Sequence, residues 1–162
     1  MRCEIQKAIL NDTQDIKNLI NEYASKDLML SKTEAQIFDD IWSFYVAREN
    51  NENALTDNDN LMGCCSLGIN SEWGSLGEIK SLAVKEIVQK QGVGKKMVES
   101  CIEEARNIGL KKVFTLTYQN NFFEKIGFVE IKKDELPQAV WAECVNCHKF
   151  PDCNEIAMAM DL

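Results

Sequence analysis

The stretch that decides the fold is EIKSLAVKEIVQKQGVGKKMVES, residues 78–100. A strand comes first, and a strongly amphipathic helix follows over about residues 92–107. The loop between them carries Gln89, Gly92 and Gly94. Glycines at a helix start let the backbone approach a ligand closely, and the unpaired amides of the first turn lie at the positive end of the helix dipole. The pattern is therefore typical of a phosphate-binding site.

This loop does not match the common nucleotide-binding motifs. It lacks G-x-x-x-x-G-K-[ST], because glutamine stands five residues before Gly94. It also lacks G-x-G-x-x-G, because Met97 stands where the third glycine belongs. Two glycines alone fit an ordinary loop before a core helix equally well. The lysines Lys90, Lys95 and Lys96 add local positive charge, and this favours the phosphate interpretation.

Length and composition bound the class of protein. The chain has 162 residues, 45% of them hydrophobic and 27% charged, which predicts a single globular domain over residues 1–162. The net charge of −8 argues against a nucleic-acid partner, because phosphate contacts need a dense basic face. No stretch resembles a signal peptide or could cross a bilayer. We therefore expect a cytoplasmic protein with a small-molecule partner and no membrane partner, and a homodimer is its candidate assembly.

The remaining patterns predict strands and short helices on both sides of this motif. Helices are expected at residues 12–24 and 120–127. A further short helix is expected to start at a capping box formed by Ser31 and Glu34. Strands are expected at residues 2–10, 42–47, 61–69, 76–84, 111–118, 128–131 and 155–162. This order predicts an α/β (α+β) protein with helices packed on a mixed, mostly antiparallel sheet.

Several side chains are assigned to faces of these elements. Trp42, Phe44 and Val46 should share one face of their strand, whereas Cys64 and Cys65 should point to opposite faces of theirs. The helix that follows the glycine loop should bury a stripe made of Val93, Met97, Cys101, Ala105 and Ile108.

The loop sequence resembles that of a known family. Gln89-Lys90-Gln91-Gly92-Val93-Gly94 is similar to the [QR]-x-x-G-x-[GA] acetyl-CoA loop of the GCN5-related N-acetyltransferases, or GNAT family. The resemblance continues through GEIKSLAV and FFEKIGF and covers most of the chain. It implies the GNAT fold, with six to seven strands and helices on both faces. It also implies that acetyl-CoA is held by the loop and Lys95 and by the strand residues Leu82, Ala83 and Val84.

A narrower resemblance is to the acetyltransferase domain of N-acetylglutamate synthases. It is carried by GEIKSLAV, VFTLTY, FFEKIGF and IAMAMDL, and LPQAVWAECVNCHKFPDC resembles a short, stand-alone version of that enzyme. This resemblance implies acetyl transfer from acetyl-CoA to the α-amine of L-glutamate, the first step of arginine biosynthesis.

Amine acetylation needs a base, an oxyanion-stabilising group and a proton donor for the departing thiolate. The resemblance gives the role of general base to Glu78, and a Glu78–Lys80 pair on a solvated strand face is the alternative. A backbone amide near Leu82 or Ala83 would hold the oxyanion.

The proton donor is less well defined by the sequence. Many members of the family use a tyrosine where this chain has Phe123, which cannot donate a proton. Tyr118 is the nearest hydroxyl and the candidate acid, with Thr117 and direct protonation by solvent as alternatives.

Glutamate carries two carboxylates, so its pocket needs cations. Lys32, Arg48 and Lys80 are the candidates, and each of them is equally a candidate for an ordinary solvated surface charge.

The Cys-rich segment, residues 136–154, precedes the last strand and carries Cys144, Cys147, Cys153 and the single histidine, His148. Cys144 and Cys147 have the spacing of a zinc knuckle, and Cys153 is a candidate third ligand. The letters C-x-x-C-H also match c-type haem attachment, but that requires export and no export signal is present. No convincing fourth zinc ligand follows, so bound zinc, reduced thiols and a disulfide all remain open.

Two other functions stay open at this stage. The chain could acetylate another small amine or a peptide, or it could be a metal-binding regulatory protein whose acyl-CoA site is vestigial.

Overall fold

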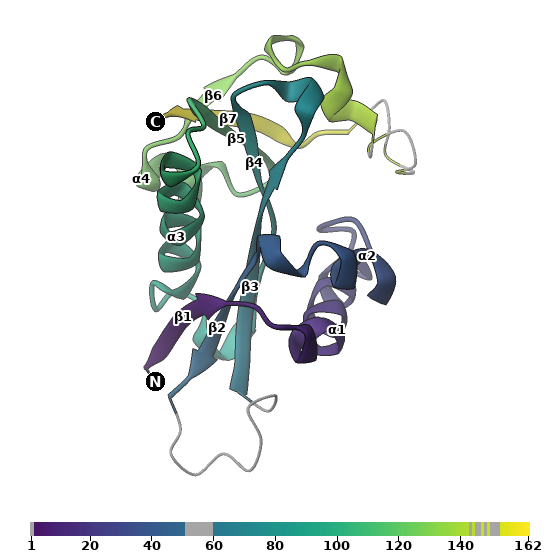
Figure 1. The fold of residues 1–162 in the computed structure, drawn as a ribbon, viewed down its shortest axis with the longest axis vertical. Helices are drawn as coiled ribbons and strands as arrows, with labels where there is room; N and C mark the ends of the chain where they lie inside the picture. Colours follow the sequence, from purple (N-terminus) through teal and green to yellow (C-terminus); the bar gives the residue numbers. More distant parts are fainter. Residues whose placement is uncertain (1, 51–59, 143, 145–146, 148, 150–152) are drawn as a thin grey trace. The chain divides into compact units, whose positions relative to one another are not determined.

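The chain forms seven strands and four α-helices within residues 2–50, 60–142, 144, 147, 149 and 153–162, the part described by a computed structural model (Figure 1). The strands are β1 (Cys3–Lys7), β2 (Phe44–Glu49), β3 (Leu61–Ile69), β4 (Leu76–Val84), β5 (Lys112–Thr117), β6 (Val129–Ile131) and β7 (Ile156–Asp161). The α-helices are α1 (Thr13–Ala24), α2 (Glu34–Asp39), α3 (Val93–Asn107) and α4 (Asn120–Ile126). The described 3-10 helices are η1 (Leu10–Asp12), η2 (Ile41–Ser43), η4 (Ser71–Trp73), η5 (Glu86–Val88), η6 (Lys133–Glu135) and η7 (Gln138–Ala142). In these residues no helix has the length and apolar character needed to cross a membrane.

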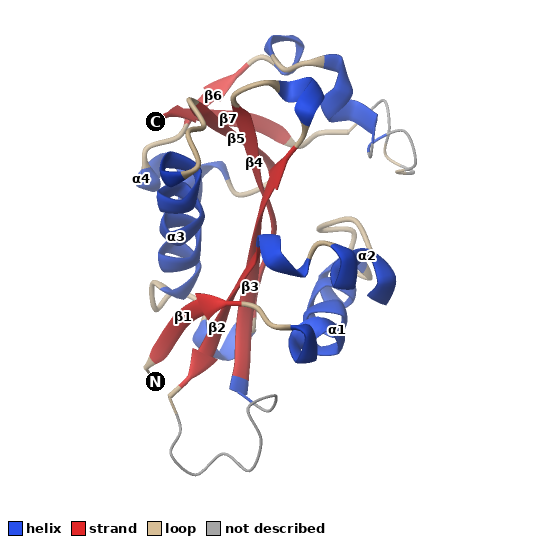
Figure 2. Cartoon of the chain, in the orientation of Figure 1, coloured by secondary structure: helices blue, strands red, loops and turns tan. Residues whose placement is uncertain are grey.

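The strands form one sheet in the order β1-β2-β3-β4-β5-β7-β6 (Figure 2). β1 and β2, β2 and β3, β5 and β7, and β6 and β7 pair antiparallel, whereas β4 and β5 pair parallel. The predicted mixed, mostly antiparallel sheet is therefore confirmed. The backbone divides into two compact units, Met1–Leu67 with Ser81–Cys101 and Gly68–Lys80 with Ile102–Leu162. β3, β4 and α3 each run from one unit into the other.

The first unit buries both faces of β3. Cys64 belongs to a core cluster with Ile16 and Ile20 of α1, while the Cys65 Sγ lies 3.8 Å from the Cys101 Sγ of α3. Successive strand residues point to opposite faces, so α1 and α3 cover opposite faces of β3, as expected for Cys64 and Cys65. The cluster on the α1 side consists of Ile16, Leu19, Ile20, Ile37, Phe44, Val46, Leu61, Cys64 and Ala83.

A glycine allows α3 to pack closely on β3. A Cβ at Gly63 would lie 2.7 Å from the Met97 Cε and 3.1 Å from the Ala83 carbonyl oxygen, closer than ordinary van der Waals contact. Met97 belongs to the predicted helix stripe, in which Val93, Cys101 and Ala105 are also buried. The absence of a side chain at position 63 therefore makes room for the helix that follows the glycine loop.

The second unit is built around β7, which lies between β5 and β6. The β5–β7 ladder runs from Lys112 opposite Asp161 to Thr117 opposite Ile156. Phe114 packs with Leu136, Val140, Ala157 and Ala159, and the Trp73 ring lies edge-on to it at 5.6 Å. Residues from the predicted Cys-rich segment thus contribute to the core of this unit.

The structure corrects the predicted start of α2. The expected capping box of Ser31 with Glu34 is wrong, because the helix begins at Glu34 with Thr33 as its N-cap. The Gln36 amide donates to the Thr33 Oγ1 at 3.2 Å, and the Thr33 amide donates to the Gln36 Oε1 at 2.9 Å. The Asn21 side chain of α1 bonds both the carbonyl and the amide of Lys32, at 3.2 and 3.1 Å. These bonds hold residue 32 outside the helix.

Two other side-chain expectations were wrong. Trp42 lies in η2 rather than in the strand and is 56% exposed, whereas Phe44 and Val46 lie on β2 and are both buried. Ile108 is 53% exposed because α3 ends at Asn107, one residue before it, and Gly109 turns the chain with a φ of +92°.

Candidate active site

The loop predicted to bind phosphate lies in the first unit, between β4 and α3. Lys90 has a φ of +62° and Gly92 a φ of +84°, so two of its residues are left-handed. The first α-helical bond of α3 runs from the Lys96 amide to the Gly92 carbonyl at 3.1 Å. The amides of Val93, Gly94 and Lys95 therefore precede the helical hydrogen-bond ladder, as expected at a helix start that can bind an anion.

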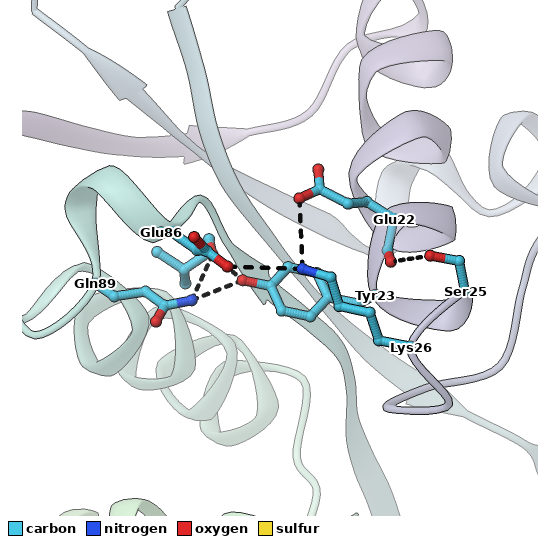
Figure 3. Close-up of polar contacts among 7 residues, drawn as sticks. Glu22, Tyr23, Ser25, Lys26, Glu86 and Gln89 are labelled. Carbon is cyan, nitrogen blue, oxygen red and sulfur yellow. Dashed lines mark hydrogen bonds and ion pairs between the residues drawn. The ribbon is translucent and has the colours of Figure 1, made fainter.

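Side-chain amides on this loop bond back to the elements that precede it. The Gln89 Nε2 donates to the Tyr23 hydroxyl at 2.7 Å and to the Val84 carbonyl at 3.1 Å, and the Tyr23 hydroxyl donates to the same carbonyl. The Gln91 Nε2 donates to the Ile87 carbonyl at 3.1 Å. Figure 3 shows that Tyr23 of α1 points toward Gln89. The loop is thus tied to β4, η5 and α1.

Strand β4 is distorted directly before the residues predicted to hold the oxyanion. Ser81 has a φ of +54°, which is uncommon for a residue with a side chain and unusual inside a strand. The Cys64 thiol donates to the Ser81 carbonyl at 3.4 Å. Because a left-handed residue interrupts the alternation of a strand, it reorients the backbone amides that follow. Those amides belong to Leu82 and Ala83.

Glu78 lies on β4 in the second unit, where the β4–β5 ladder ends. The register runs from Leu76 opposite Lys112 to Glu78 opposite Phe114. One residue later, the Ile79 carbonyl accepts a hydrogen bond from the Thr115 hydroxyl at 2.9 Å. A side-chain hydroxyl thus bonds this carbonyl at the point where the ladder ends. Glu78 is half-buried at this position.

Tyr118, the candidate acid, follows β5 in the same unit and is held by a lysine. The Lys149 Nζ donates to its hydroxyl at 2.6 Å and lies 4.6 Å from the centre of its ring. Burial raises the pKa of Tyr118 above its ordinary value of 10.0, while the hydrogen bond from Lys149 acts in the opposite direction. Because the ammonium occupies a lone pair of the hydroxyl oxygen, the phenolic proton is left to be donated elsewhere.

Thr117, the alternative side-chain donor, and Phe123, which cannot donate a proton, have structural roles. The Thr117 Oγ1 accepts a hydrogen bond from the Gln119 amide at 2.8 Å. Phe123 is 3% exposed and packs edge-on against Phe122 and Phe128, so its ring belongs to the core. These contacts leave Tyr118 as the stronger candidate.

Acidic and thiol groups surround this part of the second unit. Burial raises the pKa of Cys144 to about 11, with further contributions from the carboxylates of Glu155 and then Glu78. Burial also raises the pKa of Glu155, against the opposing charges of Lys149 and Lys133. Cys153 and Glu155 also raise the pKa of Tyr118. Glu78 thus acts on Cys144 of the Cys-rich segment, and Glu155 and Cys153 act on both Cys144 and Tyr118.

The described thiols do not form a metal site. All seven cysteines are free thiols, and no three Cys, His, Asp or Glu side chains are grouped to hold a metal within the residues that the structure describes. His148 lies outside the described residues. The donors of Cys144, Cys147 and Cys153 thus do not fit a bound ion by themselves, and zinc at this segment stays a prediction.

The candidate cations for the acceptor occupy different surroundings. The Arg48 guanidinium forms an ion pair with Asp12, whose side chain is fully buried and also accepts from the Ile9 amide at 2.8 Å. Lys32 is half-buried beside α1. The Lys80 stem lies over Gly68, where an added Cβ would come within 3.0 Å of its Cε. The ion pair gives Arg48 a structural role, and acceptor binding by all three residues stays a prediction.

Sequence reasoning missed several residues that the structure adds to the site. The Tyr23 ring packs against the core, and its hydroxyl bonds Val84 and Gln89. Lys149 and Ser81 carried no recognisable signal, because a lysine in a polar loop and a serine in a strand are both ordinary.

Comparison with known proteins agrees with this geometry. Residues 40–130 match the acetyltransferase (GNAT) domain family. The chain is 33% identical over 158 residues to an uncharacterized N-acetyltransferase of Chlorobaculum tepidum, covering 98% of this chain and 96% of that protein. It is 30% identical over 139 residues to an amino-acid acetyltransferase of Mycobacterium tuberculosis, covering 86% and 75% of the two proteins.

Solved structures are similar over the whole chain. A Mycobacterium tuberculosis protein solved in complex with CoA gives a TM-score of 0.80 at 26% identity, with 98% of this chain and 99% of that chain covered. The N-acetylglutamate synthase of Neisseria gonorrhoeae, solved with CoA and N-acetyl-glutamate, gives a TM-score of 0.84 at 24% identity. This similarity is one of fold. The match covers 100% of this chain and 35% of the Neisseria chain. The chain belongs to the GCN5-related N-acetyltransferase (GNAT) family of acetyl-CoA-dependent enzymes.

Proposed function

We propose that this enzyme transfers the acetyl group of acetyl-CoA to the α-amine of an amino acid, with L-glutamate as the acceptor. The observation that carries the proposal is the loop Gln89–Gly94, in which left-handed Lys90 and Gly92 precede the first-turn amides of α3. This arrangement suits the diphosphate of CoA. The 30% identity to an amino-acid acetyltransferase supports an amino acid as acceptor. A place in arginine biosynthesis is part of the proposal and follows only if the acceptor is glutamate.

The proposed chemistry is direct attack of the acceptor amine on the thioester. Glu78 takes a proton from the ammonium, through a water or directly, and the neutral nitrogen forms a bond to the carbonyl carbon. The backbone amide of Leu82 or Ala83 stabilises the oxyanion as the C–S bond breaks. Tyr118 gives its phenolic proton to the departing thiolate and regains a proton from the nitrogen, which must lose its second proton to become the amide. Lys149 holds the hydroxyl oxygen in place. The products are an N-acetyl amino acid and free CoA.

The acceptor carboxylates require cations, and Lys32 and Lys80 are proposed for this role. Arg48 is the weakest of the three candidates because its guanidinium already neutralises the buried Asp12. That ion pair is also the observation that favours the second function, acetylation of another small amine. The acceptor experiment therefore has to test both functions.

The acceptor is tested by measuring thiol release from acetyl-CoA with a panel of amino acids, polyamines and short peptides. The proposal expects turnover with L-glutamate to exceed turnover with every other amine. Turnover with a different amine would replace glutamate while leaving the acetyltransferase reaction intact. Absence of turnover with every amine would favour a regulatory protein with a vestigial acyl-CoA site.

The base is tested by Glu78→Gln, which keeps the shape of the side chain but removes its ability to accept a proton. We expect kcat to fall by about a hundredfold or more, with little change in the KM for acetyl-CoA. Glu130→Gln is the matched control, since Glu130 is exposed on β6 of the same unit. An unchanged kcat in Glu78→Gln would remove Glu78 from the mechanism.

A further inference from the structure

Three polar groups form a closed triangle beside the glycine loop. The Tyr23 hydroxyl donates to the Val84 carbonyl, and the Gln89 Nε2 donates to both the hydroxyl and the carbonyl, at 2.7 and 3.1 Å. The hydroxyl thereby uses its single proton and one lone pair, and the amide uses both of its protons. All three groups belong to the first unit. The triangle joins α1, the last residue of β4 and the first residue of the acetyl-CoA motif.

The hydroxyl is a dependable donor at this position. Burial raises the pKa of Tyr23 above its ordinary value of 10.0, while the hydrogen bond from Gln89 lowers it in part. The phenol therefore stays protonated at neutral pH and can donate to Val84.

An ion pair crosses the same junction but contributes less. Figure 3 shows the Lys26 ammonium paired with Glu86 of η5 and Glu22 of α1. The Nζ–oxygen distances are 3.6 Å to Glu86 and 3.9 Å to Glu22. All three side chains are about half or more exposed, so salt and side-chain entropy weaken the attraction. Tyr23, with its ring packed on the core and its hydroxyl bonded, is the firmer connection.

The position of the triangle matters because the strained part of the loop begins directly after it. Gln89 is followed by Lys90 with a φ of +62°, and then by Gly92 with a φ of +84°. A left-handed residue with a side chain costs free energy, so it persists only where its neighbours are fixed. The residue directly before Lys90 is the one that Tyr23 holds through its side chain.

We propose that Tyr23 is a positioning residue for the CoA diphosphate. Its hydroxyl fixes Gln89 against the end of β4, so that the loop amides face the phosphates before the ligand arrives. Ordering the loop in advance removes part of the entropy lost on binding. This inference rests on the proposed use of the Gln89–Gly94 loop for acetyl-CoA. It predicts a role in cofactor affinity and none in the chemical step.

The test is Tyr23→Phe, which removes the hydroxyl and keeps the ring. We expect the Kd for CoA, measured by calorimetry, and the KM for acetyl-CoA to rise about fivefold, the effect of losing one to two hydrogen bonds. The kcat at saturating acetyl-CoA should not change. The kcat/KM for S-acetylpantetheine, which has no diphosphate, should also stay the same. A variant that had merely disturbed the fold would lose activity with both acetyl donors.

Two further variants make the result specific. Tyr45→Phe removes a half-buried hydroxyl from β2 of the same unit and should leave the Kd for CoA unchanged. In a Gln89→Leu background, Tyr23→Phe should add little further loss, because the two residues act together.

Several outcomes would overturn the inference. They are an unchanged Kd in Tyr23→Phe, an equal loss with S-acetylpantetheine, or fully additive losses in the double variant. Failure of the unmodified protein to bind CoA would instead contradict the proposed function.

Discussion

The Tyr118 hydroxyl shows how one residue's surroundings can prepare it for proton transfer. Burial raises its pKa, so the phenol is protonated at neutral pH, and the Lys149 ammonium opposes that shift from 2.6 Å. The lysine thus brings the phenol closer to the range in which it can release a proton during turnover. A tyrosine without the lysine would be a weaker acid.

Tyr118→Phe should therefore lower kcat about a hundredfold. In Lys149→Met the pKa of Tyr118 should rise, because the opposing contribution is lost. Activity that requires a protonated tyrosine falls as the pH rises through its pKa. The alkaline limb of the kcat profile should accordingly move to higher pH in Lys149→Met and be missing in Tyr118→Phe. A pH series of initial rates checks both outcomes. If the alkaline limb does not move in Lys149→Met, Lys149 does not influence the pKa of the proton donor.

The roles of individual residues were the part of the site that the sequence predicted least well. The glycine loop could be predicted because its spacing is local and its chemistry resides in the backbone. Tyr23, Lys149 and Asp12 could not, because their roles depend on partners 66, 31 and 36 positions away in the chain. Arg48 was expected at the acceptor for its charge, and the buried Asp12 that pairs with it gave no signal in the sequence.

Elements were predicted more accurately than residues, for reasons that differ along the chain. β3 and β4 were predicted to the residue, since short apolar runs bounded by polar turns define both ends. The start of α2 was wrong because Ser31 with Glu34 and Thr33 with Gln36 both fit a capping box. The choice between them is made by Asn21, a tertiary contact from α1 to Lys32.

The two capping residues give a direct test of that choice. Thr33→Ala should lower the free energy of unfolding by about 1 kcal/mol, because the Gln36 amide loses its acceptor. Ser31→Ala is the matched control and should change it by less than about 0.5 kcal/mol, as for a surface substitution. Urea unfolding of the two variants measures both values. A larger loss in Ser31→Ala than in Thr33→Ala would restore the capping box expected from the sequence.

Across the whole molecule, the seven thiols differ in chemical character. Cys64, Cys65 and Cys101 are fully buried, whereas Cys3, Cys144, Cys147 and Cys153 are partly exposed. Burial raises the pKa of Cys64 to about 12, and the hydrogen bond with Cys101 followed by burial raises that of Cys65. Thiolates are the reactive form, so the three core thiols should be inert.

Native alkylation should reveal this difference. With iodoacetamide at pH 8, mass spectrometry should find Cys64, Cys65 and Cys101 unmodified until the protein is unfolded. Cys144, with a pKa of about 11, should react about a hundredfold more slowly than an ordinary thiol of pKa 9.0. Cys3, whose pKa is also raised, serves as a partly exposed comparison from the other unit. Rapid labelling of the core thiols in the folded protein would contradict their burial.

The place of β7 in the sheet has a consequence for how the chain can fold during synthesis. β7 lies between β5 and β6, although both of those strands precede it in the sequence. When β5 and β6 leave the ribosome, neither has its shared partner, and Phe114 lacks Ala157 and Ala159 from its core. The sheet of the second unit can therefore close only after residues 156–161 have emerged. Until then, the edges of β5 and β6 are open to pairing with other nascent chains.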